Sequence, residues 1–224
     1  LALPVFPASA FDALLFRGFQ AWTWLLPGIG ARDAREGQAR FYHERGSEGG
    51  VSLVLGAGNV ASIGPLDALQ RLFVEGRTVV LKLNPVNDYL LPVFERQFAT
   101  FLTRGYLTIV TGGADVGRYL VEHPLIDDVH ITGSHDTHDA IVWGQGEEAA
   151  RRRAAGAPLL TKKITSELGN VTPVLIAPGP YTPAELRAIA TNVAGMVTNN
   201  ASFNCNAAKL LITPRGWSGR DALL

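Results

Sequence analysis

The chain has 224 residues, of which 47% are hydrophobic, enough for one large domain or for one domain with part of another. Its 20 basic and 20 acidic residues cancel, so it lacks a global field that would attract nucleic acid, an anionic membrane or a strongly acidic partner. The single cysteine, Cys205, excludes an intramolecular disulfide. Absence of a disulfide framework is typical of a reducing compartment, so we expect a cytoplasmic protein. From the balanced charge we expect no nucleic-acid or membrane partner.

Residues 1–50 are expected to form a helical or irregular lead-in. Apolar residues are frequent at its start, but Pro4, Asp12 and Arg17 interrupt them before a membrane-spanning length is reached. The apolar positions of residues 11–26 suit an amphipathic helix, and the polar, glycine-rich segment through Gly50 is typical of surface structure. We therefore predict neither a transmembrane helix nor a cleaved signal in this region.

From residue 51 onward, β-prone apolar runs alternate with segments of helical spacing. The expected strands are 51–55, 78–83, 107–110, 128–131, 163–166 and 174–177. The expected helices are 65–75, 89–104, 116–122, a helix-permissive stretch at 136–158, and 183–197 beginning after Thr182. Such alternation requires a parallel sheet covered on both faces, because each crossover helix packs back onto the sheet. The predicted class is α/β, a Rossmann-like doubly wound parallel sheet.

The first candidate for chemistry is the turn Gly56-x-Gly58-x-x-Ala61, which follows a strand and precedes a helix, as a dinucleotide-binding fingerprint does. The usual acidic residue at the end of the second strand is absent, because that strand ends in Lys82, Leu83, Asn84 and Pro85. An ordinary tight turn is therefore an equal alternative at this position.

Three more candidates follow along the chain. Thr132-Gly133-Ser134 ends a strand, where backbone donors and a hydroxyl can hold a phosphate or a serine can simply cap a helix. Glu167 also ends a strand, as a ligand-site base or as a surface turn residue. Cys205 lies among asparagines, as a nucleophile or as a small buried apolar residue.

The order and spacing of these residues resemble the aldehyde dehydrogenase superfamily over roughly residues 51–214. Gly58-Asn59 is similar to the family's turn with the oxyanion-stabilising asparagine, and Lys82 falls where the family keeps its adenosine-ribose lysine. Ile131-Thr132-Gly133-Ser134 resembles the family's phosphate turn. Glu167-Leu168-Gly169-Asn170 resembles the segment with the general base, and Cys205, 38 residues after Glu167, falls where the nucleophile is expected.

The resemblance implies three catalytic residues, Cys205, Glu167 and Asn59. The cofactor-binding residues that it implies are Gly58, Lys82, Asn84, Gly112, Thr132, Gly133, Ser134, Leu168 and Gly169, with no metal ligand. It also implies a nucleotide-binding domain at 51–180 and the beginning of a catalytic domain at 181–224. The chain ends about twenty residues after Cys205, so we expect it to be part of a longer protein that forms a homo-oligomer.

Several positions depart from the family's pattern. Gly58 replaces an aromatic residue, Ser202-Phe203 replaces Gly-Gln before the nucleophile, Asn170 replaces a glycine, and Pro85 replaces the ribose-binding glutamate. With no carboxylate at Pro85 to repel a 2′-phosphate, and with Lys82 to attract one, either NAD or NADP is expected as cofactor.

The function implied by the resemblance is NAD(P)-dependent oxidation of an aldehyde to a carboxylic acid through a thiohemiacetal and a thioester on Cys205. A related enzyme that passes the acyl group to coenzyme A is an alternative, although Glu167 favours hydrolysis. A nucleotide-binding module without turnover and a generic Rossmann-like domain that uses Gly56 to Ala61 are two further alternatives.

Overall fold

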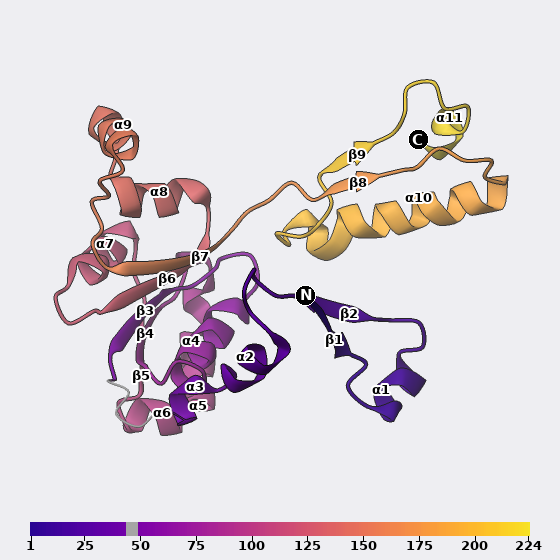
Figure 1. The fold of residues 1–224 in the computed structure, drawn as a ribbon. Coiled ribbons are helices and arrows are strands. Elements are labelled where there is room, and N and C mark those ends of the chain that lie inside the picture. Colours follow the sequence, from indigo (N-terminus) through magenta and orange to yellow (C-terminus); the bar gives the residue numbers. More distant parts are fainter. Residues whose placement is uncertain (44–48) are drawn as a thin grey trace. The chain divides into compact units, whose positions relative to one another are not determined.

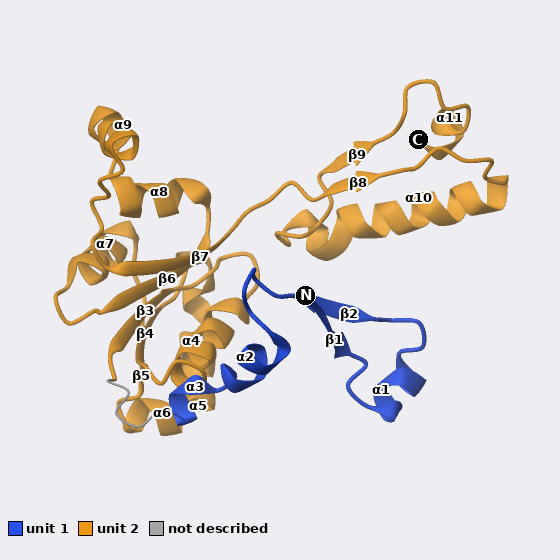
Figure 2. Cartoon of the chain, viewed as in Figure 1, with its two compact units in different colours: residues 1–48 blue, residues 49–224 orange. Residues whose placement is uncertain are grey.

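The computed structural model describes residues 1–43 and 49–224, which divide into two compact units, 1–48 and 49–224 (Figure 2). In the described part of the first unit, β1 pairs antiparallel with β2. Its elements are β1 (Ala2–Phe6), α1 (Ala10–Leu15), β2 (Ala21–Trp24), α2 (Ala31–Glu36) and α3 (Arg40–His43).

The predicted helix over residues 11–26 is wrong beyond its first turns. Helix α1 begins after Ser9, whose side chain accepts a hydrogen bond from the Asp12 backbone N–H, and it ends at Leu15. Gly18 then adopts a φ of +87°, which an α-helix does not contain. The chain reverses and residues 21–24 pair with β1, so partners distant in sequence override the helical spacing of the apolar residues.

In residues 49–224, five strands form one parallel sheet in the order β5-β4-β3-β6-β7 (Figure 1). The strands are β3 (Val51–Leu55), β4 (Thr78–Lys82), β5 (Leu107–Val110), β6 (Asp128–Gly133) and β7 (Lys163–Leu168). The chain moves from β3 outward to β5 and then returns to β6 on the other side of β3. Strand order therefore reverses between β3 and β6, which is the switch point of a doubly wound sheet. The predicted fold class is confirmed.

The crossover segments are helical, with more breaks than the sequence predicted. They comprise α4 (Ile63–Phe73), the 3-10 helix η1 (Pro85–Leu90), α5 (Leu91–Gln97), α6 (Ala99–Thr103), α7 (Ala114–Glu122), α8 (His135–Trp143) and α9 (Gly146–Ala155). The expected single helix at 89–104 is wrong, since it divides into three pieces. The stretch at 136–158 divides at Gly144, whose φ of +85° ends α8.

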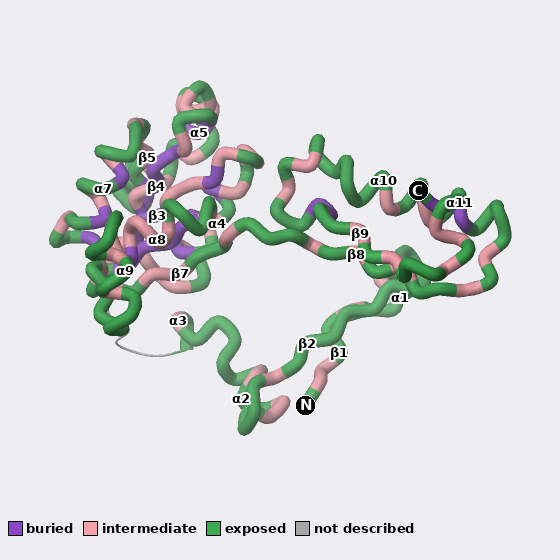
Figure 3. The backbone as a smooth tube through the Cα atoms, turned by 90° about the horizontal axis from the view of Figure 1, so that it is seen from above, coloured by how far each residue is buried: buried purple, intermediate pink, exposed green. Residues whose placement is uncertain are grey.

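Alternate residues of the strands fill two separate cores, one on each face of the sheet. Leu53 packs with Val121 of α7 and Val129 of β6, while its neighbour Val54 packs with Ala68 of α4 and Leu81 of β4. Leu53 and Val54 are both 0% exposed, because β3 lies in the middle of the sheet and is covered on both sides. Figure 3 shows the buried residues concentrated around these central strands.

The C-terminal part of the second unit contains a separate pair of strands. The expected strand at 174–177 forms as β8 (Pro173–Leu175), but it pairs in parallel with β9 (Leu210–Ile212) instead of extending the large sheet. Helix α10 (Pro183–Thr198) lies alongside this pair, and the short η2 (Asn199–Ser202) and α11 (Arg220–Leu223) complete the chain (Figure 1). The division at residue 180 stays a prediction.

Helix α10 begins as the sequence predicted. The Thr182 side chain accepts a hydrogen bond from the Glu185 backbone N–H, while the Glu185 carboxylate accepts one from the Thr182 backbone N–H. The Thr182 hydroxyl also donates a hydrogen bond to this carboxylate. The backbone bond and the side-chain bond from Thr182 together lower the pKa of Glu185. Among the described residues, no helix is both long and apolar enough to cross a bilayer.

Candidate active site

The carboxyl ends of the parallel strands border a cavity of about 910 Å³ at the point where strand order reverses. This volume lies in the upper part of the usual range for small-molecule sites. The lining includes all the residues predicted for the site except Gly112: Asn59, Glu167 and Cys205, together with Gly58, Lys82, Asn84, Thr132, Gly133, Ser134, Leu168 and Gly169. Residues separated by almost 150 positions in the sequence thus line the same cavity.

The turn after β3 explains the glycine at position 58. A Cβ atom at Gly58 would lie 2.9 Å from the side-chain amide of Asn84. Asn84 cannot move freely, because its Oδ1 accepts a hydrogen bond of 3.1 Å from the Val86 backbone N–H and so caps η1. The aromatic residue that the family usually has here would displace Asn84, so Gly58 and Asn84 fit as a pair.

Asn59 connects the same turn to the cysteine loop. Its Nδ2 donates a hydrogen bond of 2.9 Å to the Phe203 carbonyl, two residues before Cys205. A side-chain amide carries two N–H donors, so this bond leaves one of them for a ligand. This hydrogen bond connects the predicted oxyanion donor, Asn59, to the segment that contains the predicted nucleophile, Cys205.

Before Cys205 the backbone is strained. Asn200, Ala201 and Ser202 have φ values of +48°, +51° and +69°, in the left-handed region where residues with a Cβ atom are disfavoured. Ser202 stands where the family commonly has glycine, which adopts this conformation without a steric cost. The loop presents the Cys205 thiol as a free, exposed cysteine at the cavity. The alternative of a small buried apolar residue is wrong.

Lys82 ends β4 with a buried side chain. Its Nζ donates hydrogen bonds to the Leu83 carbonyl, at 3.0 Å, and to the Gly112 carbonyl. Burial lowers the pKa of Lys82, while the charges of Asp88 and Asp115 oppose this shift. Gly112, predicted to bind the cofactor, is not among the residues that line the cavity. In this structure its carbonyl instead accepts a hydrogen bond from Lys82.

The turn after β6 joins the sheet to α8. The Ser134 side chain accepts a hydrogen bond of 3.1 Å from the Thr137 backbone N–H, so the serine acts as a helix cap. Capping leaves other N–H groups of the first turn of α8 available to a phosphate, although Asp136 in that turn opposes an anion. Thr137 also lines the cavity and was not predicted.

Glu167 lies within β7 and not after it, because the strand continues to Leu168. It pairs in register with Thr132 of β6, and Leu168 pairs with Gly133. Paired residues of neighbouring strands leave the sheet on the same face, so Glu167 and Thr132 project to the same side. Glu167 is exposed, and it lines the cavity.

Sequence reasoning missed several residues of this wall. Arg118 of α7 brings a second cation to the cavity near Lys82, and Asn170 and Phe203 border it from the C-terminal part. Arg118 could have been predicted from its position, because it lies in the helix after β5. It directly follows Gly117, which also lines the cavity. Within residues 1–43 and 49–224, no group of three His, Cys, Asp or Glu side chains is placed to hold a metal ion.

A doubly wound parallel sheet with a cavity at its switch point defines the class of Rossmann-like α/β proteins, here with a thiol, a carboxylate and an amide in the cavity wall. The model of the aldehyde dehydrogenase family matches residues 38–219, which is most of the chain. The protein belongs to the aldehyde dehydrogenase family.

Individual relatives agree with this assignment. N-succinylglutamate 5-semialdehyde dehydrogenase 1 of Caulobacter vibrioides is 34% identical over 118 residues, which cover 53% of this chain and 22% of that protein. The structure of an NAD-dependent aldehyde dehydrogenase from Sinorhizobium meliloti is 27% identical with a TM-score of 0.54, covering 78% of this chain and 31% of that one. An NADP-dependent enzyme of E. coli, 23% identical with a TM-score of 0.55, shares the fold over 78% of this chain and 34% of its own. The chain therefore spans about a fifth to a third of these relatives.

Proposed function

We propose that the protein containing this chain oxidises an aldehyde to a carboxylic acid with NAD or NADP, and that Cys205 is the nucleophile. The observation that carries the proposal is the shared cavity: Cys205, Glu167 and Asn59 line the same cavity as the turns after β3 and β6. A nucleophile, a base and an amide donor around one cavity are what acyl chemistry at a carbonyl carbon requires.

In the first step the Cys205 thiolate attacks the carbonyl carbon of the aldehyde, forming a C–S bond and an alkoxide oxygen. The free N–H of the Asn59 amide and the backbone N–H of Cys205 donate to this oxygen. The hydrogen bond from Asn59 to the Phe203 carbonyl keeps the amide beside the cysteine loop before substrate arrives. Loss of one such donor typically raises the barrier by about 3 kcal/mol.

The residues around the cavity fit a nicotinamide dinucleotide. Lys82 and Arg118 are cations in its lining, Gly56 and Gly58 contribute backbone without side chains, and α8 offers free N–H groups. A bound NAD or NADP would supply the hydride acceptor with which the carbon attached to Cys205 is oxidised to a thioester. Lys82, Ser134 and the Gly133 backbone are the groups that we expect to hold the coenzyme.

Glu167 then removes one proton from a water molecule. The water oxygen bonds to the thioester carbon, the C–S bond breaks, and Cys205 leaves as a thiolate with release of the carboxylic acid. The chemistry requires Cys205 to stay reduced, which fits a cytoplasmic site of action. We further propose a homo-oligomeric full-length protein, on the family resemblance alone.

The test is to follow labelling of the single cysteine by a thiol-reactive probe, using mass spectrometry, with and without NAD or NADP. We expect Cys205 to react faster than a cysteine in a short unstructured peptide, and coenzyme to change the rate. A slow reaction that ignores both nucleotides would overturn the proposal and favour a module without turnover. Transfer of the acyl group to added coenzyme A, in preference to water, would instead support the acylating alternative.

Both coenzymes are expected to bind with similar affinity. Pro85 offers no carboxylate to the adenosine ribose, whereas Lys82 and Arg118 border the same cavity and attract a 2′-phosphate. Titration calorimetry with NAD and NADP should give dissociation constants within about tenfold of each other, since 1.4 kcal/mol of preference corresponds to a factor of ten. A stronger preference for NAD would contradict this expectation, and Pro85→Glu should create such a preference.

A further inference from the structure

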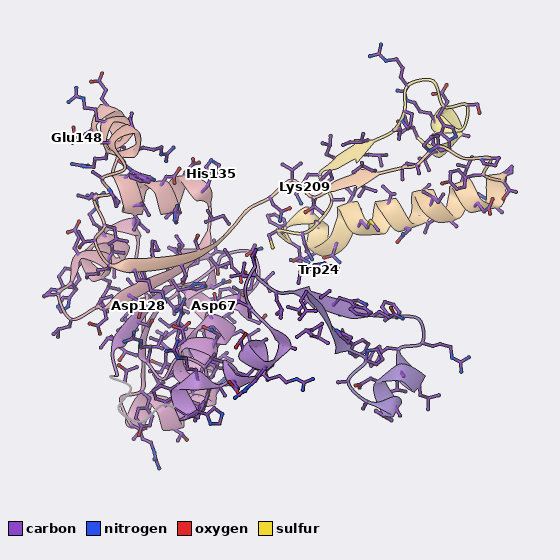
Figure 4. All side chains as sticks on the ribbon, viewed as in Figure 1. Trp24, Asp67, Asp128, His135, Glu148 and Lys209 are labelled. Carbon is purple, nitrogen blue, oxygen red and sulfur yellow. The ribbon has the colours of Figure 1, made fainter. Side chains whose placement is uncertain are left out.

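A network of polar side chains next to the cavity connects α4 with the strands β6 and β7. Asp67 of α4 accepts a hydrogen bond of 2.9 Å from the Thr132 hydroxyl, and its Oδ2 also lies 3.5 Å from His130 Nε2. Asp67, labelled in Figure 4, lies beside the sheet. Thr132 is the only member of this trio that lines the cavity, so the other two can act on a ligand only through it.

The remainder of the network fixes the histidine. Arg71 is 4% exposed, and its Nη2 lies 3.1 Å from His130 Nδ1 and donates to the Thr165 hydroxyl. Because arginine is always a donor, His130 Nδ1 accepts, and the ring proton lies on Nε2, facing Asp67. Glu75 binds the other side of the guanidinium at 2.5 Å. The position of Asp67 is thus set by a buried network that extends from the end of α4.

The direction of the Thr132 bond determines what its hydroxyl offers to the cavity. An aspartate carboxylate accepts only, so the Thr132 proton is committed to Asp67. The hydroxyl oxygen of Thr132 has two lone pairs. His130 Nε2 lies 3.4 Å from this oxygen, a long contact that occupies at most one of them, so the other lone pair is free. Thr132 therefore faces a ligand as a hydrogen-bond acceptor.

Its neighbour on the sheet is the predicted base. Glu167 pairs in register with Thr132, so the two side chains leave the sheet side by side on one face. A water molecule has two protons, and two acceptors that are neighbours on one face of the sheet can bind one proton each. Its oxygen lone pair is then left to face a thioester on Cys205, which borders the same cavity.

We infer that Asp67 is a positioning residue for hydrolysis: it holds Thr132 as the second acceptor for the water that Glu167 activates. The inference rests on the proposed function. One water proton passes to Glu167, the other stays hydrogen-bonded to Thr132 Oγ1, the C–O bond forms, and Cys205 departs as a thiolate. Asp67 touches no substrate and acts through Thr132.

The test uses 4-nitrophenyl acetate with the longest natural polypeptide that contains residues 1–224. Thiolate attack releases 4-nitrophenolate in a burst, and the following steady rate reports hydrolysis of the acetyl thioester, without coenzyme or a known aldehyde. Asp67→Leu should lower the steady rate about tenfold and leave the burst rate within about twofold, because a lost hydrogen bond to a charged group has an effect of this size. Mass spectrometry should show acetyl groups accumulating on Cys205.

Three further variants separate positioning from a general structural effect. Asp67→Asn keeps an oxygen acceptor and should restore most of the steady rate. Thr132→Val should reproduce Asp67→Leu, and the double variant should be no slower than either, because both remove the same contact. Additive losses, or a burst that falls as much as the steady rate, would overturn the inference. A wild-type protein that releases 4-nitrophenolate no faster than Cys205→Ala, with no acetyl group on Cys205, would instead refute Cys205 as nucleophile, so the two failures are distinguishable.

Discussion

Replacement of Cys205 by alanine should reduce aldehyde oxidation by about ten-thousandfold or more, because removal of a covalent nucleophile leaves only the binding and polarising groups of a site. The measurement is formation of reduced coenzyme by the full-length protein, with a panel of aliphatic and aromatic aldehydes. Within residues 1–224 Cys205 is the only cysteine, so no other thiol of this part of the protein can replace it. Any residual activity should come only from the binding and polarising groups that remain.

Coenzyme affinity provides the control for this variant. Cys205 is exposed and follows η2, whereas Lys82, Gly133 and Ser134, which are expected to hold the coenzyme, come from other segments, so the substitution should leave the dissociation constant of NAD or NADP within about twofold. Ser202→Gly is a matched change in the same loop. It relieves a φ of +69° and should preserve activity. Full activity in Cys205→Ala would show that the proposed mechanism is incorrect.

The second large effect is expected at Glu167. Glu167→Gln keeps the size of the side chain but removes the base, so turnover should fall by about a hundredfold to ten-thousandfold, the usual contribution of general base catalysis. The first step does not need this base once the thiolate exists. An initial burst of reduced coenzyme should therefore persist, and mass spectrometry should detect the acyl group retained on Cys205.

Glu148→Gln is the control for the loss of a carboxylate. Glu148, labelled in Figure 4, lies on α9 and forms surface ion pairs with Arg151 and Arg152, outside the cavity lining. Surface pairs of this kind contribute little, so turnover should be unchanged. If Glu167→Gln lost the burst together with turnover, Glu167 would act on the thiol before the aldehyde binds, and not only on water afterwards.

Two features of the site give a physical account of its departures from the family pattern. Gly58 is required by its contact with Asn84, which caps η1, so loss of the aromatic residue follows from a local packing constraint. Ser202 adopts a glycine-like conformation, and the loop around it is held by bonds from Asn59 to Phe203 and between the Phe203 backbone N–H and the Asn200 carbonyl. These contacts compensate for a strain of about 1–3 kcal/mol per residue.

The sequence alone determined the parallel sheet and the order of its turns. Each of the five strands is a short β-prone run, a helical segment follows four of them, and the burial of β3 on both faces follows from its apolar residues. Most of the candidate residues could be located because they come at or shortly after the end of a strand, whereas Cys205 follows α10 and η2 and was located through the family resemblance. The carboxyl ends of parallel strands meet at one edge, so the sequence order of these turns also brings them together in space.

Only the tertiary structure decided which partner each side chain has. The β1–β2 pairing replaced a predicted helix, and β8 paired with β9 apart from the large sheet, because hydrogen bonds between distant segments outweigh local propensity. The register of β6 on β7 placed Thr132 beside Glu167, and packing of α4 brought Asp67 under Thr132. Register and helix packing depend on contacts over many residues, which a pattern of neighbouring amino acids does not encode.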